Sequence, residues 1–66
     1  MAKSKMSKTV TKLREAMKLS KAALARKAGL EVVTIKRLEA GKVNPRLETL
    51  QALAKALNVP LVELLP

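Results

Sequence analysis

The sequence of 66 residues contains no cysteine, no histidine and no aromatic residue. Without cysteine there is no disulfide, no thiolate metal site and no cysteine nucleophile. Without histidine the chain lacks the commonest general base and the commonest metal ligand. Without aromatic side chains it cannot stack bases, which argues against a platform for single-stranded nucleic acid. The chain also has only five acidic residues and no glycine-rich phosphate loop, so we expect no enzymatic activity, no cofactor, no metal and no small-molecule substrate.

Positive charge is abundant, because 14 lysines and arginines face five acidic residues and give a net charge of +9. Residues 1–12 contain four lysines and no acid, and residues 13–46 contain nine basic and three acidic residues. Residues 47–66 contain one lysine and two glutamates, and are rich in leucine and alanine. Such a balance indicates a polyanionic partner, nucleic acid first and an anionic membrane surface second. We expect residues 1–46 to face it and the C-terminal third to supply core and protein contacts.

A membrane role is disfavoured by the distribution of apolar and basic residues. No stretch approaches the roughly 18 apolar residues of a membrane span. The basic residues are spread over several segments separated by glycine and proline, whereas a membrane-surface peptide needs one continuous amphipathic helix. We therefore expect one domain, residues 9–66, preceded by a flexible basic arm, residues 1–8. This arm is either a solvated tail or a segment that orders on a polyanion.

Apolar residues recur every three or four positions in five segments, which predicts an all-α domain of five short helices. The expected helices are Ser7–Met17, Lys21–Ala28, Val32–Ala40, Leu47–Leu57 and Leu61–Leu65. Ser20 is a good N-cap residue, and Gly29 and Gly41 stand where a helix end favours a left-handed residue. Thr34, like the apolar residues beside it, is expected to face inward.

The second and third predicted helices are joined by about three residues that include Gly29. This is the spacing of a helix-turn-helix, in which the second helix of the pair can enter the major groove of DNA. On that helix, Val32, Val33, Lys36 and Arg37 stand at positions i, i+1, i+4 and i+5, so they share one outward face.

Residues 10–65 also contain an ordered set of short motifs around the predicted helix-turn-helix. It includes Leu19-Ser20-Lys21, Ala28-Gly29-Leu30, Leu38-Glu39-Ala40-Gly41-Lys42 and Asn44-Pro45. With these motifs at these spacings, the sequence resembles the lambda repressor/Cro-like (XRE) family of helix-turn-helix domains. The resemblance implies a DNA-binding transcriptional regulator.

The resemblance also implies which residues contact DNA. Base contacts map to Val32, Val33 and Arg37, with Lys36 on the same face, whereas the alternatives are partial packing of the valines and an ordinary solvated face. Backbone contacts map to Lys21, Lys42 and Arg46, and the arm adds Lys3 and Lys5; for Lys42 and Arg46 the alternative is solubility alone. A salt bridge between Arg14 and Glu39 is expected to orient the recognition helix. Glu31 departs from the family, because it stands where serine or threonine usually caps that helix.

The expected function is sequence-specific regulation of transcription, usually repression, by a homodimer on a pseudo-palindromic operator in double-stranded DNA. Leu61, Val62, Leu64 and Leu65 are the expected dimer contacts, although Leu61 and Leu64 could instead close the core. The alternative function is an antitoxin-like or anti-regulator domain whose main partner is another protein. The family resemblance implies a cytoplasmic protein of bacterial, archaeal or phage origin, associated with the nucleoid when bound.

Overall fold

The computed structural model of the chain describes residues 5–65. They form four α-helices and a closing 3-10 turn, and no strand is present within this range. The elements are α1 (Lys5–Ala16), α2 (Lys21–Ala28), α3 (Val32–Glu39), α4 (Leu47–Leu57) and η1 (Leu61–Leu64). The predicted all-α fold class is therefore confirmed. None of the helices within residues 5–65 is long and apolar enough to cross a membrane.

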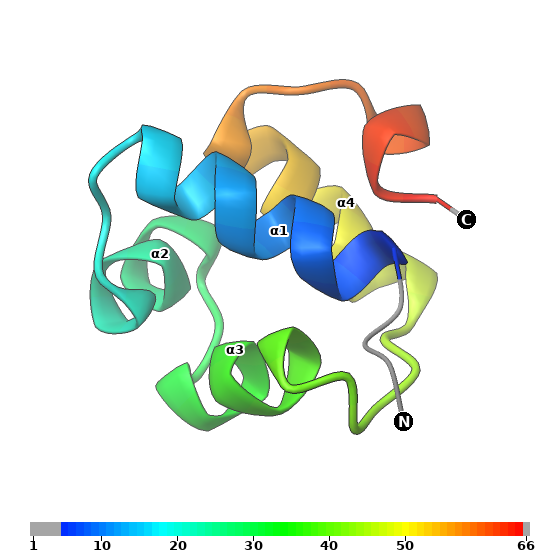
Figure 1. Cartoon of the computed structure of the whole chain (residues 1–66), viewed down its shortest axis with the longest axis horizontal. Helices are drawn as coiled ribbons and strands as arrows, with labels where there is room; N and C mark the ends of the chain where they lie inside the picture. Colours follow the sequence, from blue (N-terminus) through cyan, green and yellow to red (C-terminus); the bar gives the residue numbers. More distant parts are fainter. Residues whose placement is uncertain (1–4, 66) are drawn as a thin grey trace.

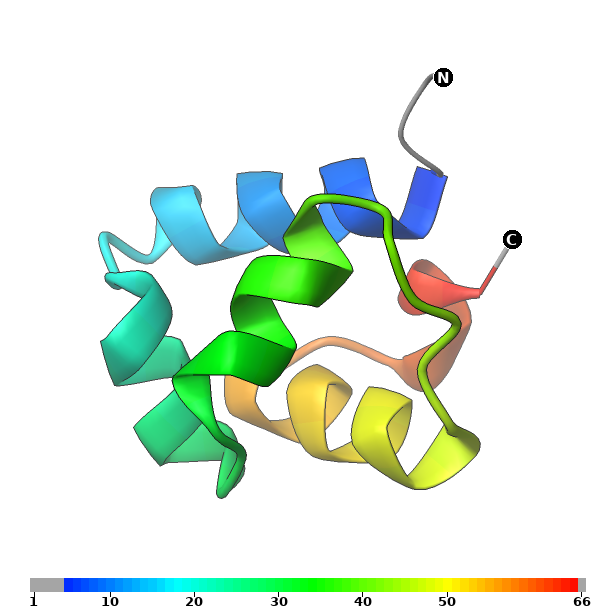
Figure 2. The ribbon, with the colours of Figure 1, turned by 90° about the horizontal axis from the view of Figure 1, so that it is seen from below.

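The helices surround a single core and leave one side of α3 uncovered. Figure 1 shows α1 in front of α4, with α2 at one end and α3 below them. α2 packs against α3 and α4, while α1 packs against α3 and η1. Seen from below in Figure 2, α3 runs across the front of the molecule between α1, α2 and α4. The outward face of α3 is consequently free to meet a partner.

Aliphatic side chains from every element fill the core. Six of them have no exposed surface: Val10, Leu24, Ile35, Leu38, Leu53 and Leu64. Burying one such side chain contributes about 1.5–3 kcal/mol relative to leaving it exposed. Because a chain of this size can bury only a small core, these contacts between α1, α2, α3, α4 and η1 provide most of the stability.

All four α-helices end in the same hydrogen-bonded motif with a left-handed residue. The residues with positive φ are Lys18, Gly29, Gly41 and Asn58. After α2, for example, the Gly29 N–H donates to the Arg26 carbonyl at 3.2 Å and the Leu30 N–H donates to the Ala25 carbonyl at 2.8 Å. These bonds satisfy carbonyls that the helix itself leaves free. The sequence predicted glycine at two of these ends, but the left-handed Lys18 was not expected.

The start of α1 and the type of the last element differ from the predictions, and α1, α3 and η1 each end one residue earlier than expected. α1 begins at Lys5 rather than Ser7, so residues 5–8 of the expected arm lie in a helix; residues 1–4 lie outside the described part of the chain. Ser7 is completely buried, and its hydroxyl donates to the Leu38 carbonyl of α3 at 2.8 Å. The fifth helix is a 3-10 turn, because its hydrogen bonds run from Glu63 to Pro60 and from Leu65 to Val62, three residues apart.

Candidate nucleic-acid interface

α2 and α3 are joined by a tight turn that fixes one helix against the other. The Ser20 hydroxyl accepts a hydrogen bond from the Ala23 N–H at 3.0 Å and so caps the start of α2. Gly29 ends α2 with a φ of 71°, a backbone conformation that costs glycine little. Leu30 then packs against the core, and α3 begins two residues later at Val32. This geometry is that of a helix-turn-helix.

The four residues predicted to read bases lie together on α3. Val32, Val33, Lys36 and Arg37 are all exposed, while Ile35 and the other inward residues of the helix are buried. Val32 and Val33 are 37% and 42% exposed, so part of each valine side chain is open to a partner. The face therefore combines an apolar part near the start of α3 with two cations one turn further on.

Arg14 joins three parts of the fold beneath this face. Its Nε donates to Glu39 Oε2 at 2.8 Å, and its Nη2 donates to Glu39 Oε1 at 3.1 Å. Its Nη1 donates to the Leu19 carbonyl, just before α2, at 2.8 Å. The side chains of Arg14 and Glu39 are only 11% and 4% exposed. The hydrogen bonds to Glu39 raise the pKa of Arg14 above its ordinary value, although burial acts in the opposite direction.

A second connection from α1 reaches α3 one residue away. The buried Ser7 hydroxyl donates to the carbonyl of Leu38, and Leu38 precedes Glu39. The C-terminal end of α3 is thus held by a neutral hydrogen bond and by a bidentate ion pair, both from α1. A fork of two parallel bonds restricts direction as well as distance. Together these bonds fix the angle at which α3 presents its outward face.

The predicted backbone-contacting cations that the structure describes are all exposed, and they come from different elements. Lys21 is the exposed first residue of α2, and Lys5 is the exposed first residue of α1. Lys42 and Arg46 are exposed in the loop between α3 and α4, and Arg46 directly precedes α4. Lys3 lies outside the described residues. Lys21 therefore stands where free N–H groups of a helix start favour an anion such as phosphate.

A notch of about 240 Å³ brings α3 and the following loop together. Arg37 from α3 and Arg46 from the loop both line it, as do Thr34, Asn44 and Thr49. The sequence analysis placed Thr34 inward and assigned no contact to Asn44 or Thr49. The sequence carries no signal that brings Asn44 and Thr49 near Arg37, because their proximity depends on the path of the loop between α3 and α4. The notch combines two guanidinium groups with neutral hydrogen-bonding groups, a set that suits phosphate oxygens.

The helix start beside the proposed base-reading valines lacks a side-chain cap. Glu31 occupies the N-cap position of α3 with extended φ and ψ, but its side chain makes no capping hydrogen bond. Its charge lies near the positive end of the helix dipole, which is a modest favourable effect.

Within residues 5–65, no group of three acidic side chains is close enough to hold a metal ion. The chemistry available on this face is thus hydrogen bonding, charge and apolar contact.

The C-terminal residues divide between the core and the surface. Leu64 is completely buried, and Leu61 is partly buried against the core. Val62 and Leu65 are 67% and 37% exposed. Leu64 therefore offers no surface to a second chain, which corrects its assignment as a dimer contact: the 3-10 turn directs it inward between α1 and α4.

Comparison with known proteins identifies the class to which this geometry belongs. Residues 10–64 match the helix-turn-helix family HTH_3, and the chain belongs to that family. The predicted family resemblance is confirmed, and the domain is a DNA-binding, XRE-like transcription regulator fold. No curated protein sequence matches the chain significantly.

Three solved structures share the fold. The restriction-modification controller protein C.AhdI from Aeromonas hydrophila is 33% identical over 92% of each chain, with a TM-score of 0.88. The DNA-binding domain of the P22 C2 repressor is 31% identical over 97% of this chain and 84% of that one, with a TM-score of 0.87. An HTH_3 family transcriptional regulator from Vibrio cholerae is 24% identical, has a TM-score of 0.87, and is matched over 92% of this chain and 34% of its own length.

Proposed function

We propose that the protein is a transcriptional repressor that binds double-stranded DNA as a homodimer, at an operator with approximate two-fold symmetry. The observation that carries this proposal is the outward face of α3, which is uncovered (Figure 2) and carries Val32, Val33, Lys36 and Arg37. A helix of this kind fits the major groove, where every base pair presents a distinct pattern of groups. The likeness to the DNA-binding domain of the P22 C2 repressor supports repression as the outcome.

Base recognition on this face divides between charge and apolar contact. The Arg37 guanidinium can donate two hydrogen bonds to O6 and N7 of a guanine, which is worth about 1–3 kcal/mol of discrimination. Val32 and Val33 have no hydrogen-bonding side-chain atoms and contact thymine methyl groups. Lys36 donates to a guanine or to a nearby phosphate. The half-site is therefore expected to contain at least one guanine next to a thymine-rich step.

Phosphate contacts come from cations that flank α3. Lys21 approaches one strand with the N–H groups at the start of α2, and Lys42 and Arg46 approach the other from the loop. Lys5 and Lys3 extend the contact from the start of the chain. If each half-site involves about four such contacts, a dimer releases about eight counterions, and the affinity falls by about 10³–10⁵ between 50 and 200 mM salt.

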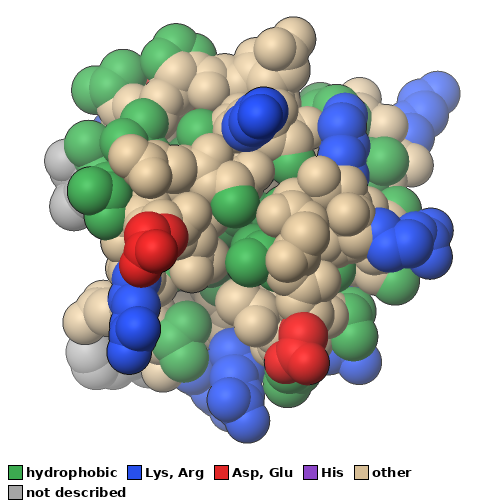
Figure 3. Space-filling model, turned by 180° about the vertical axis from the view of Figure 1, so that it is seen from behind, with side chains coloured by type: hydrophobic (Ala, Val, Ile, Leu, Met, Phe, Trp, Pro, Cys, Tyr) green, Lys and Arg blue, Asp and Glu red, His purple; other side chains and the backbone are tan. Residues whose placement is uncertain are grey.

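The exposed apolar residues of the C-terminal segment supply the proposed dimer contact. Figure 3 shows hydrophobic side chains gathered on the side of the molecule where this segment lies. Val62 and Leu65 are the exposed members, and Leu61 adds the part of its surface that the core leaves open. To read a two-fold operator, a dimer paired through this surface needs its two copies of α3 on the same side of the DNA. Their half-sites are then about 34 Å, one helical turn, apart.

Selection of bound fragments from a random DNA pool tests this function directly. We expect an enriched sequence with two inverted half-sites, and sedimentation of the complex should give two chains per site. Val62→Asp should weaken binding to the full operator but leave the weak binding to one half-site unchanged. Selection of sequences without symmetry, or one chain per site at saturation, would contradict the homodimer.

The role of Arg37 is tested by comparing base preferences. Arg37→Ala should lose preference at one guanine of each half-site, by about 1–3 kcal/mol, and keep the preferences elsewhere. Lys12→Ala removes another exposed positive charge, from α1, and serves as the control; its preferences should match those of the unmodified protein. If Arg37→Ala weakens binding equally to all sequences, Arg37 contacts phosphate rather than a base.

A further inference from the structure

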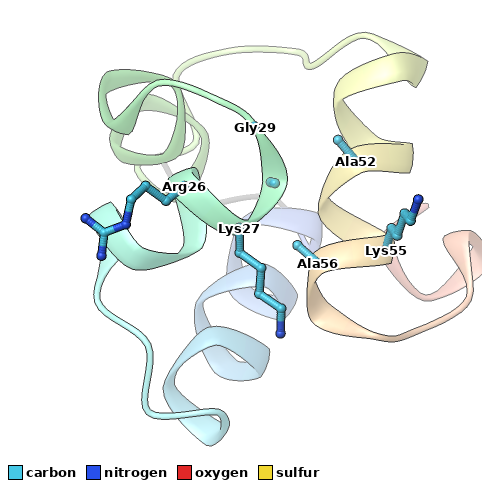
Figure 4. A pocket seen from close by; sticks show the side chains of 7 residues that line it. Arg26, Lys27, Gly29, Ala52, Lys55 and Ala56 are labelled. Carbon is cyan, nitrogen blue, oxygen red and sulfur yellow. The ribbon is translucent and has the colours of Figure 1, made fainter.

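A groove separate from the α3 face lies between the end of α2 and the outer side of α4. It has a volume of about 500 Å³ and is lined by Arg26, Lys27, Ala28, Gly29, Ala52, Lys55 and Ala56. Figure 4 shows Ala52 and Ala56 pointing from α4 toward α2, with the side chains of Lys27 and Lys55 extending on either side of them and that of Arg26 pointing away from α4. No heavy atom lies within 4 Å of the position that a Cβ on Gly29 would occupy. The floor is thus small and apolar, and the rim is cationic.

The three cations of the rim have no acidic partner within the described part of the chain. Both salt bridges found there use Arg14, which lies elsewhere. No carboxylate lines the groove. Cations in the last turn of a helix interact favourably with its dipole, and this applies to Arg26 and Lys27 at the end of α2 and to Lys55 at the end of α4. Two helices therefore direct unpaired positive charge at the borders of one apolar groove.

We propose that this groove binds an acidic helical segment of a partner protein. One aliphatic side chain of that segment enters between α2 and α4, and its carboxylates meet Arg26, Lys27 and Lys55. Ala52 and Ala56 are four residues apart on α4, so they lie on one face of the helix. Ala56 is already buried at 4% exposure, so Ala52 is the alanine that leaves space for a second helix to approach closely. Helices that place spaced aliphatic residues in a groove, with complementary charge at its edges, are a general mode of peptide recognition.

The shape and charge of the groove favour this occupant over DNA or a second copy of the chain. A duplex presents charged phosphates and sugars, which cannot fill an apolar depression formed by four alanine and glycine residues. A second copy is already assigned to the C-terminal surface, and it brings only five acidic residues among 14 basic ones to a cationic rim. An acidic segment neutralises the rim and fills the floor, and it leaves the α3 face free for DNA.

The test is a selection of random 16-residue peptides displayed on phage against the intact protein. We expect the selected peptides to share an aliphatic residue flanked by Asp and Glu at helical spacing. Ala52→Leu, which fills the floor, and Lys55→Glu, which reverses one rim charge, should each weaken peptide binding about tenfold or more. Lys12→Glu makes the same charge change on α1, outside the groove, and should leave peptide affinity within about twofold. Circular dichroism checks that each variant is folded.

Two results would overturn the proposal. In one, the selected peptides bind Ala52→Leu and Lys55→Glu as tightly as the unmodified protein. In the other, operator DNA displaces the peptides and their amide chemical-shift changes map to α3, in which case they imitate DNA. A third measurement separates this proposal from the repressor function: the DNA affinity and salt dependence of Lys55→Glu. Unchanged values support a groove that is independent of DNA, and a reduced salt slope assigns the groove to the DNA backbone instead.

Discussion

Arg14 and Glu39 connect α1 to the end of the recognition helix through two hydrogen bonds of 2.8 and 3.1 Å between nearly buried side chains. A buried pair of this kind need not stabilise the fold relative to apolar residues, because both charges lose their hydration. The Arg14 guanidinium also donates a hydrogen bond to the carbonyl of Leu19, which ties it to the segment that enters α2. The arrangement therefore sets the relative positions of α1, α2 and α3, on which the DNA-facing surface depends.

Removing one member of this pair is expected to be costly. Arg14→Ala leaves the Glu39 carboxylate buried without its partner and should lower the free energy of unfolding by about 3–5 kcal/mol. The double variant Arg14→Ala/Glu39→Ala should lose less than the sum of the two single changes. Urea unfolding measures all three values. Arg14→Lys keeps a charge but loses the fork, so it should remain folded and bind the operator more weakly; strictly additive losses and unchanged affinity would show that the pair is not coupled.

Lys18 ends α1 in a left-handed conformation that suits glycine better. Its φ is 57°, and a side chain at this conformation costs roughly 1–2 kcal/mol. Lys18→Gly relieves that strain but increases the freedom of the unfolded chain, so the net gain should be about 0.5–1 kcal/mol. Lys12→Gly, in the middle of the same helix, should lose about 1 kcal/mol. Thermal unfolding compares the two; a loss at both positions would contradict the explanation.

A side-chain N-cap at the start of α3 should increase the stability of the protein. Glu31 has the extended backbone of an N-cap residue but makes no side-chain capping bond, whereas Ser20 caps α2 with a bond of 3.0 Å. Glu31→Ser should therefore raise stability by about 0.5–1 kcal/mol. The substitution also removes an anion beside the residues of α3 that are proposed to contact the major groove of DNA, so operator affinity should rise. The reverse change, Ser20→Glu, should lower stability by about the same amount. Chemical denaturation and a binding titration give the two answers.

Stability is expected to vary little with pH around neutrality. The sequence has no histidine or cysteine, the side chains that most often change charge there. The pKa of Arg14 is raised in the folded protein, so its stabilising effect is fully present below the pKa of an unfolded-state arginine. That effect is lost only as the pH rises through the folded-state value. Urea midpoints between about pH 6 and 9 should therefore agree closely; a clear transition in this range would contradict the expectation.

Much of the helical framework could be predicted because its signals are local. α2 and α4 have the predicted bounds, and Gly29, Gly41 and Asn58 lie at helix ends where a left-handed residue is needed. The spacing of aliphatic residues and the Gly-containing turn then indicated a helix-turn-helix. The exposure of Val32, Val33, Lys36 and Arg37 followed from helical periodicity alone.

The features that could not be predicted depend on residues far apart in the sequence. Ser7 lies 31 residues from Leu38, and only the packing of α1 on α3 reveals why a serine is buried inside α1. Thr49 and Arg37 line the same notch because of the path that the loop takes from α3 to the start of α4. The separation of buried Leu64 from exposed Val62 depends on the 3-10 geometry of four residues, which a helical pattern cannot resolve.

The sequence by itself determined the all-α class, the helix-turn-helix and the cationic face of α3, because charge, periodicity and helix ends are encoded by neighbouring residues. The family resemblance also implied the Arg14–Glu39 pair, which the structure contains. Only the tertiary structure decided that Ser7 holds α3, which C-terminal residues remain exposed, and that α2 and α4 border an apolar groove with a cationic rim. The physical reason is that burial and side-chain pairing between distant segments depend on how whole helices pack.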